Sequence, residues 1–145
     1  MGTMTIEESL QAQLSRSSRI TAIVGSRLWQ GRLPRNSFPT GTTPPALTFW
    51  RVARRGFIPL PVKRGGHARP RFQLDCWAKT DTGVGALRDA VLAELQGFQG
   101  LLGGSGGITV SDITLENCYD VFERKTGIYH VALDFFIFHG EETQA

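Results

Sequence analysis

The chain has 145 residues, a length that fits one domain with a hydrophobic core of its own. Hydrophobic residues make up 41% of the chain and charged residues 20%, which indicates a globular protein and excludes a disordered one. No apolar run approaches the roughly 18 residues that a membrane span requires, so we expect no membrane partner.

Charge is distributed unevenly along the chain. Residues 1–78 hold 12 Lys and Arg against 3 Asp and Glu, a net charge of +9. Residues 79–145 hold 4 against 10, a net charge of −6. A chain polarised in this way often meets a charged partner, or meets copies of itself head to tail.

The first predicted element is a short helix. Thr5 and Glu8 have the spacing of a capping box. The residues that follow form an apolar stripe with a period of four: Ile6, Leu10 and Leu14. Ser17 or Ser18 can cap a second turn or two of helix, and Gly25 would end it.

Three strand candidates follow, over residues 27–33, 46–53 and 71–78. Residues 54–70 carry glycines, prolines and positive charge, so we expect a long basic loop between two strands that pair. The strand over residues 71–78 alternates in polarity. One face holds Phe72, Leu74, Cys76 and Ala78, and the other holds Arg71, Gln73, Asp75 and Trp77.

The next segment raises the possibility of a phosphate site, because a strand there runs through a glycine-containing turn into a helix. The dinucleotide fingerprint G-x-G-x-x-G needs a third glycine, which is missing after Gly83 and Gly85. The carboxylate of Asp81 would also repel a phosphate. Thr80 and Asp81 instead suit the start of a helix over residues 82–95. Ser105, in GGSGG, sits between a helix and a strand and is interpreted as part of a linker, not as a nucleophile.

The carboxy-terminal part predicts two strands. Residues 108–117 alternate with a change of phase near Ser111 and Asp112, which indicates a bulge, and residues 119–127 suit a turn with Gly127 at positive φ. In the last strand, one face holds Tyr129, Val131, Leu133, Phe135 and Ile137. The other holds Ile128, His130, Ala132, Asp134, Phe136 and Phe138. A strand that is apolar on both faces needs cover on both, and we expect a neighbouring subunit to cover the second face.

These elements predict an α+β fold: a mixed or antiparallel sheet of four to five strands, with two main helices packed on one face. We expect one domain over residues 1–145, with flexible ends at about 1–4 and 141–145 and the long basic loop at 54–70.

Few residues suggest catalysis. Cys76 and Cys118 are predicted to be small buried thiols, and none of the three histidines has the spacing of a helical metal site. Asp75 and Asp134 both point away from the inward faces of their strands. On neighbouring strands they could act as catalytic carboxylates, or form hydrogen bonds at a subunit boundary, which we favour. We therefore expect no enzyme, cofactor or metal site.

The most distinctive feature is the basic segment over residues 51–71. It contains no acid and seven cations: Arg51, Arg54, Arg55, Lys63, Arg64, Arg69 and Arg71. Four apolar residues lie among them: Phe57, Ile58, Leu60 and Val62. The segment is either a solvated hairpin tip or a surface that docks on a partner subunit or beside DNA phosphates.

With these segments placed, the chain resembles the tail-completion or tail-terminator proteins of long-tailed phages and gene transfer agents. The likeness runs from about Thr5 to His139. It rests on four segments in the family's order: ITAIVGSRLWQGRLP, PPALTFWRV, RFQLDCWAKTDTGVGALRDAV and YDVFERKTGIYHVALDFFIFH. The resemblance implies a mixed sheet flanked by helices, and no catalysis or cofactor.

The resemblance also implies a structural role in the virion, at the tail or neck, after assembly in the host cytoplasm. Six copies would form a ring on the last layer of the tail tube. This ring would stop tube growth, offer a surface to a head-side connector or stopper protein, and let genomic DNA pass through its lumen.

Within that role, we expect five residues to bury surface between subunits: Trp77, Ile128, Ala132, Phe136 and Phe138. The loop over residues 54–69 would meet the tail tube, a connector protein or the lumen. Two alternatives stay open. One is another neck component, a head-tail adaptor or stopper; the other is a small DNA-binding module that uses residues 51–71.

Overall fold

The computed structural model describes residues 4–31, 45–52, 67–123 and 127–140. This part of the chain contains three helices: α1 (Ile6–Arg16), α2 (Ser18–Val24) and α3 (Asp81–Leu95). It also contains seven strands: β1 (Leu28–Gln30), β2 (Ala46–Arg51), β3 (His67–Ala68), β4 (Arg71–Ala78), β5 (Gly100–Leu102), β6 (Ile108–Glu123) and β7 (Ile128–Gly140). The α+β class is confirmed.

The strands form one mixed sheet in the order β1-β2-β4-β7-β6-β5, and β3 pairs with the end of β7. β1 and β2 are parallel, and the other pairs are antiparallel. The prediction of four to five strands was therefore wrong. Strands β3 and β5 were missed because two or three residues are too few to show an alternating pattern.

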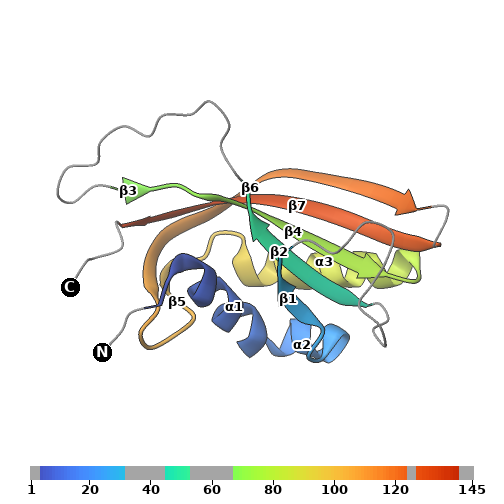
Figure 1. The fold of residues 1–145 in the computed structure, drawn as a ribbon, viewed down its shortest axis with the longest axis horizontal. Coiled ribbons are helices and arrows are strands. Elements are labelled where there is room, and N and C mark those ends of the chain that lie inside the picture. Colours follow the sequence, from blue (N-terminus) through green and yellow to red (C-terminus); the bar gives the residue numbers. More distant parts are fainter. Residues whose placement is uncertain (1–3, 32–44, 53–66, 124–126, 141–145) are drawn as a thin grey trace.

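All three helices lie on one side of the curved sheet (Figure 1). The predicted stripe of α1 is fully buried there, together with the apolar face of α3. These side chains pack against the inward residues of the central strands, including Phe49, Phe72, Leu74, Leu133 and Phe135. The prediction placed two main helices on this face; α2, foreseen as a turn or two, is the third helix.

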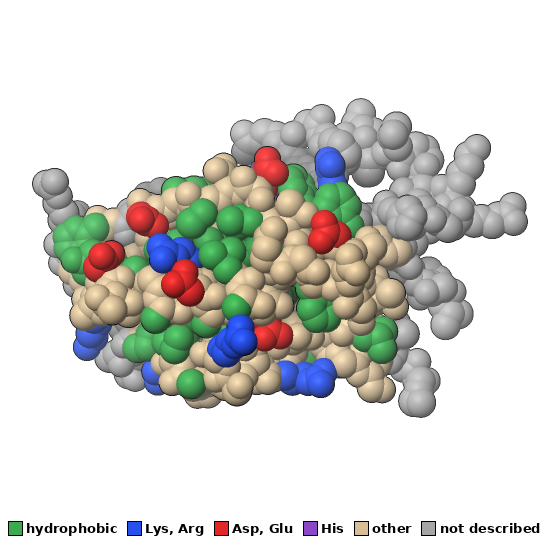
Figure 2. Space-filling model, turned by 180° about the vertical axis from the view of Figure 1, so that it is seen from behind, with side chains coloured by type: hydrophobic (Ala, Val, Ile, Leu, Met, Phe, Trp, Pro, Cys, Tyr) green, Lys and Arg blue, Asp and Glu red, His purple; other side chains and the backbone are tan. Residues whose placement is uncertain are grey.

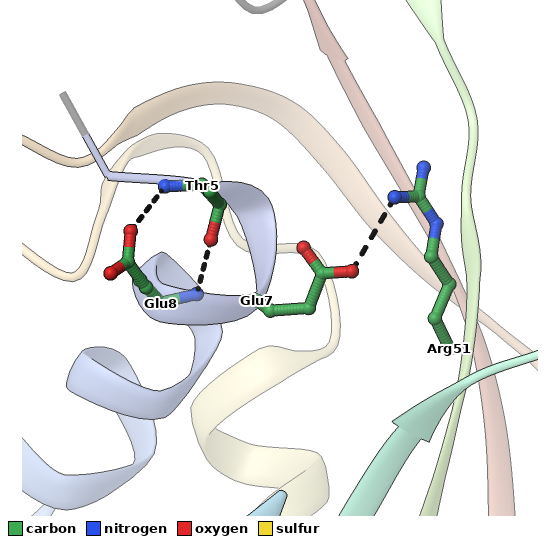
Figure 3. Close-up of polar contacts among 4 residues, drawn as sticks. All are labelled: Thr5, Glu7, Glu8 and Arg51. Atoms are coloured by element: carbon green, nitrogen blue, oxygen red, sulfur yellow. Dashed lines mark hydrogen bonds and ion pairs between the residues drawn. The ribbon is translucent and has the colours of Figure 1, made fainter.

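The predicted helix ends are confirmed. The Thr5 hydroxyl accepts a hydrogen bond from the backbone N–H of Glu8, whose carboxylate accepts one from the backbone N–H of Thr5 (Figure 3). The hydroxyl of Thr80 accepts from the N–H of Gly83, so the strand-to-helix junction uses its polar side chains to begin α3. Gly25, at φ 61°, follows the last residue of α2.

The glycine-rich stretch after α3 is not a linker. Gly100–Leu102 forms β5, which pairs with the start of β6, and the intervening turn packs on α1. The N–H of Gly103 donates to Oε1 of Gln13, and the N–H of Ile108 donates to Oγ of Ser9. The glycines allow this close approach, because a Cβ on Gly103 would lie 2.7 Å from the Ser9 carbonyl oxygen.

Strand β6 is longer than predicted. The bulge near Ser111 and Asp112 is confirmed by a register shift between Val110 and Asp112, and a second shift follows between Leu115 and Asn117. The turn predicted over residues 119–127 was wrong, since β6 continues to Glu123. Tyr119 and Phe122 favour extended backbone and pair with β7, so strand propensity prevails over the local charge. Gly127 has the expected positive φ, at 69°.

Candidate functional site

The face of the sheet away from the helices, called the outer face below, carries most of the residues singled out by the sequence. Opposite residues of paired strands share a face, and the pairs Thr48–Asp75, Gln73–Asp134 and Arg71–Phe136 all lie on this side. No helix in the described part of the chain covers it (Figure 1). Three of its polar residues are nevertheless buried: Thr48, Asp75 and Asp134.

A hydrogen-bonded network centred on Asp75 joins three strands. Oδ1 of Asp75 lies 2.8 Å from Nε2 of His130 on β7 and accepts a bond of 2.8 Å from the side-chain amide of Gln73. The indole of Trp77 stacks on the His130 ring, with centroids 4.0 Å apart and planes 6° apart. Its Nε1 donates to the hydroxyl of Thr48 on β2 at 3.1 Å. The network satisfies its buried polar atoms and locks β2, β4 and β7 together.

Asp134 lies on the same face, beside this network, in a different situation. Its Oδ1 atom is buried and has no hydrogen-bond partner among the residues that the structure describes, and the same holds for Nε of Arg71. Burial raises the pKa of the Asp134 carboxyl; nearby Arg71 opposes this shift, whereas Asp75 and Glu116 add to it. The outer face thus contains one satisfied carboxylate and one incompletely satisfied carboxylate.

The structure does bring Asp75, Asp134 and His130 to one face, as the catalytic alternative required. An Asp-His pair acts as a catalytic base when it activates a nucleophile. The hydroxyl in this network belongs to Thr48, which is fully buried and accepts from Trp77. This arrangement favours hydrogen bonding over catalysis. Within the described ranges, no group of three or more His, Cys, Asp or Glu residues could hold a metal ion.

The five predicted interface residues all lie on the outer face. Trp77, Ile128, Phe136 and Phe138 are half-buried, whereas Ala132 is fully buried within the subunit, opposite Tyr119 of β6. The guanidinium carbon of Arg69 lies 4.9 Å from the ring centroid of Phe136 and 6.0 Å from that of Phe138. The four half-buried residues leave apolar surface for contact, so their burial between subunits stays a prediction.

The basic segment is not one uniform cluster of available cations. Arg51 forms an ion pair of 3.4 Å with Glu7 of α1 (Figure 3), Arg69 covers two aromatic rings, and Arg71 lies near Asp134. These three contacts within the subunit were missed, because sequence proximity does not show which acids or rings the fold brings close. The other four cations lie outside the described residues: Arg54, Arg55, Lys63 and Arg64.

A further exposed surface lies at the far end of β6. Beyond Val110, no strand in the described chain pairs with the other side of β6. Tyr119, opposite Ala132, is exposed on the outer face, whereas Phe122, opposite Tyr129, is exposed on the helix side; Glu116 and Asp120 are exposed on the same stretch of β6. Figure 2 shows hydrophobic and acidic side chains together on the rear of the molecule. The expectation that Cys118 is buried was wrong, since it lies on this stretch, whereas Cys76 is buried as predicted.

The helices give no sign of a membrane span: none in the described chain is long and apolar enough to cross a bilayer.

Comparisons with known proteins identify a family and a solved structure with a similar fold. Residues 8–140 match the family described as tail completion protein gp17. Among curated proteins, none matches the chain. A solved structure described as the virion of a native gene transfer agent (GTA) particle contains a similar chain, with a TM-score of 0.64 and 17% sequence identity. The match covers 96% of this chain and 100% of that one, and at this identity it shows a shared fold. Because the family match spans nearly all of the sequence, the chain belongs to the tail completion protein gp17 family, whose members are structural components of the phage tail.

Proposed function

We propose that the chain is a tail terminator subunit. Six copies form a ring that caps the tail tube, ends its polymerisation and offers an attachment surface to a head-side connector or stopper protein. Genomic DNA passes through the lumen of this ring. The observation that carries the proposal is the match of residues 8–140 to the tail completion family, because completion of a tail requires a component that stops tube growth.

The outer face supports the self-contact that a ring needs. It combines half-buried aromatic side chains with buried polar groups on strands that no described helix covers. A ring is built from head-to-tail contacts, in which each subunit uses two different surfaces. The uneven charge of the chain, +9 in residues 1–78 and −6 in residues 79–145, favours attraction between copies wherever basic and acidic segments of neighbouring chains meet.

Assembly on tail tubes tests the proposal. Tubes grown from the tail-tube protein in the presence of this chain should stop growing and carry a ring at one end, and electron microscopy should show six subunits in it. If the chain remains strictly monomeric when bound to tubes, the proposal is wrong. A monomer in free solution does not contradict it, because assembly can require the tube as a template.

The other neck roles make a different prediction. An adaptor or stopper also forms a ring, so the neighbouring layer distinguishes the functions. In images of intact particles, a terminator ring lies directly on the last layer of the tail tube. A ring separated from the tube by another protein would identify the chain as a head-side component instead.

Free DNA binding is a weaker alternative, because the three described cations of the basic segment all have contacts within the subunit: Arg51, Arg69 and Arg71. A DNA-binding module would bind duplex DNA at low salt, with an affinity that falls steeply as salt rises. Replacement of Arg54, Arg55, Lys63 and Arg64 by Ala would then abolish binding. If the unmodified chain does not bind at low salt, this alternative is excluded.

A further inference from the structure

Strand β6 has an open edge along its second half, where it lies beside β7 (Figure 1). The N–H of Ile137 donates to the carbonyl of Pro70 on the β4 side of β7. Because backbone groups alternate along an antiparallel strand, the odd-numbered residues of β7 bond to β4 and the even-numbered ones bond to β6. The residues of β6 that lie opposite the odd-numbered ones therefore turn their N–H and C=O groups away from β7: Cys118, Asp120 and Phe122.

The first half of this edge is closed, whereas the second half is not. The carbonyl of Ile113 accepts from the N–H of Gly97, and the N–H of Leu115 donates to Oε1 of Gln96, both at 2.8 Å. No described residue outside β6 forms such a bond with the three outward-turned residues, which are all exposed. The large hydrophobic side chains exposed in the described chain also lie on β5 and β6: Leu101, Tyr119 and Phe122. An open edge with apolar side chains beside it suits the addition of a strand.

One segment of the chain has a matching pattern of backbone donors. For residues 53–66, which lie outside the described part of the chain, the sequence alone defines this chemistry. Pro59 and Pro61 have no backbone N–H. The residues on either side of them keep it, at a spacing of two: Ile58, Leu60 and Val62. In extended conformation such a segment can pair through one edge only, and its three donors match the spacing of the three open residues of β6.

We propose that residues 58–62 of a second copy of this chain add to the open edge of β6 as an extra strand. The inference rests on the proposed ring and identifies two parts of the chain that join neighbouring subunits in it. In either direction of the added strand, Ile58 or Val62 lies opposite the exposed ring of Phe122. The outer edge of the added strand carries prolines, so no further strand pairs with it and the addition stops at one.

The length of the chain rules out that Val62 reaches this edge within its own subunit. Six residues separate Val62 from Ala68, which is opposite His139 of β7. Phe122 is opposite Tyr129, ten residues away on the same strand. Ten residues of strand extend over about 33 Å, whereas six residues of chain span at most about 21 Å.

The other direction fails at Ile58. Six residues separate Ile58 from Val52, whose N–H donates to the carbonyl of Arg71 on β4. Arg71 is opposite Phe136, about 23 Å along β7 from the residue that pairs with Phe122. The added strand would also lie four strand spacings, about 19 Å, from β2. Neither end of the segment can therefore reach within one chain, and a second copy must supply it.

Charge favours this occupant over a second β6 edge. Glu116 and Asp120 are exposed on the open stretch, and the nearby cation, Arg88, is paired with Asp89 at 3.1 Å. Two such acidic edges repel each other, which opposes pairing of β6 with β6. The proposed segment instead has cations at both ends: Arg54, Arg55, Lys63 and Arg64.

The exposed thiol of Cys118 makes the pairing measurable. A chain with Cys118→Ser and either Ile58→Cys or Val62→Cys is mixed with the unmodified chain, assembled on tail tubes and mildly oxidised. Since Cys76 is buried, a disulfide with Cys118 then forms only between copies. Opposite residues of paired strands have Cα atoms about 5.5 Å apart, within disulfide range, so one of the two variants should give a product of twice the subunit mass. Pro59→Cys, whose side chain lies on the opposite face of the added strand, is the control and should give none.

A substitution of the central donor tests the backbone pairing itself. Leu60→Pro removes this N–H, whereas the matched variant Leu60→Ala keeps it and only shortens the side chain. Leu60→Pro should raise the concentration needed for ring assembly about tenfold to a hundredfold, and Leu60→Ala should raise it less. As free subunits, both should have the melting temperature of the unmodified chain, because the pairing forms only between copies.

The outcomes separate this inference from the proposed function. If rings form but neither Ile58→Cys nor Val62→Cys cross-links, or if Leu60→Pro assembles like Leu60→Ala, the inference is wrong and the terminator ring stands. A lower melting temperature of free Leu60→Pro would place the segment in its own subunit and also overturn the inference. So would a photoreactive phenylalanine analogue at Phe122 that attaches to the tail-tube protein and not to a second copy. If the unmodified chain forms no ring on tubes, the proposed function fails, and the inference with it.

Discussion

The turn between β5 and β6 gives the sharpest prediction about stability. Gly107 does not have a positive φ, so its backbone conformation suits any residue. Only steric contact opposes a side chain at this position. A Cβ at this position would collide with the carbonyl oxygen of Leu102 and lie 2.9 Å from that of Gly104. Both are backbone atoms of the same turn and cannot rotate away, so Gly107→Ala should force the turn to open.

The size of the effect follows from the bonds that hold this turn. Three hydrogen bonds connect it to the amino-terminal segment: Ile108 N–H to Ser9 Oγ, Gly103 N–H to Gln13 Oε1, and Met4 N–H to the Gly106 carbonyl. At about 1 kcal/mol for each bond, their loss lowers the free energy of unfolding by about 3 kcal/mol. For a chain of this size, that corresponds to a fall in melting temperature of roughly 10 °C.

Two neighbouring substitutions serve as controls in the same thermal unfolding assay. Ser105→Ala changes an exposed residue and should leave the melting temperature nearly unchanged. Gly106→Ala adds a Cβ in open space at φ +83°, and should cost roughly 1 kcal/mol for that conformation alone. If Gly107→Ala has the same melting temperature as Ser105→Ala, the steric argument is refuted. The turn then behaves as the linker that the sequence suggested.

Three further predictions follow from the sheet. Cys118 should react with a thiol reagent in the folded protein, whereas Cys76 should react only after unfolding. Because partial burial raises the pKa of Cys118, the rate of its labelling should still increase with pH above neutrality. Trp77→Phe keeps a ring beside His130 but removes the donor to Thr48, and should cost about 1–2 kcal/mol in urea unfolding; no change would show that the network does not fasten β2. Since burial raises the pKa of Asp134 above its unfolded value, the folded state takes up this proton first as pH falls. The difference in stability between Asp134→Asn and the unmodified chain should therefore shrink as pH decreases through the folded pKa, and a pH-independent difference would contradict the shift.

The sequence could predict which face each side chain of β4 and β7 occupies, because alternation is a local property of the chain. It placed Phe72, Leu74 and Cys76 inward and Asp75 and Trp77 outward, as the structure has them. It also located the capping residues, which act within three positions of themselves. The predictions that were confirmed concern structure whose cause lies within a few residues along the chain.

The predictions that failed depend on distant partners. GGSGG resembles a linker until α1 packs against it, and residues 119–123 resemble a turn until β7 pairs with them. The hydrogen bonding of the two aspartates is also nonlocal. The alternating pattern shows that Asp75 and Asp134 both face outward, but the pairing of β4 with β7 decides which one meets His130.

This register explains how one face fastens the sheet and also leaves one buried carboxylate oxygen without a described donor. Trp77 is opposite His130, so the side chains stack and bring Nε2 to the carboxylate of Asp75 at the diagonal position. Four residues further along β7, Asp134 lies opposite Gln73, whose amide is bonded to Asp75. The side-chain amide of Gln73 donates to Asp75, and no described residue donates to Oδ1 of Asp134. The internal network and the unsatisfied oxygen of Asp134 thus both follow from one register, which places Gln73 beside both carboxylates while its amide is bonded to Asp75.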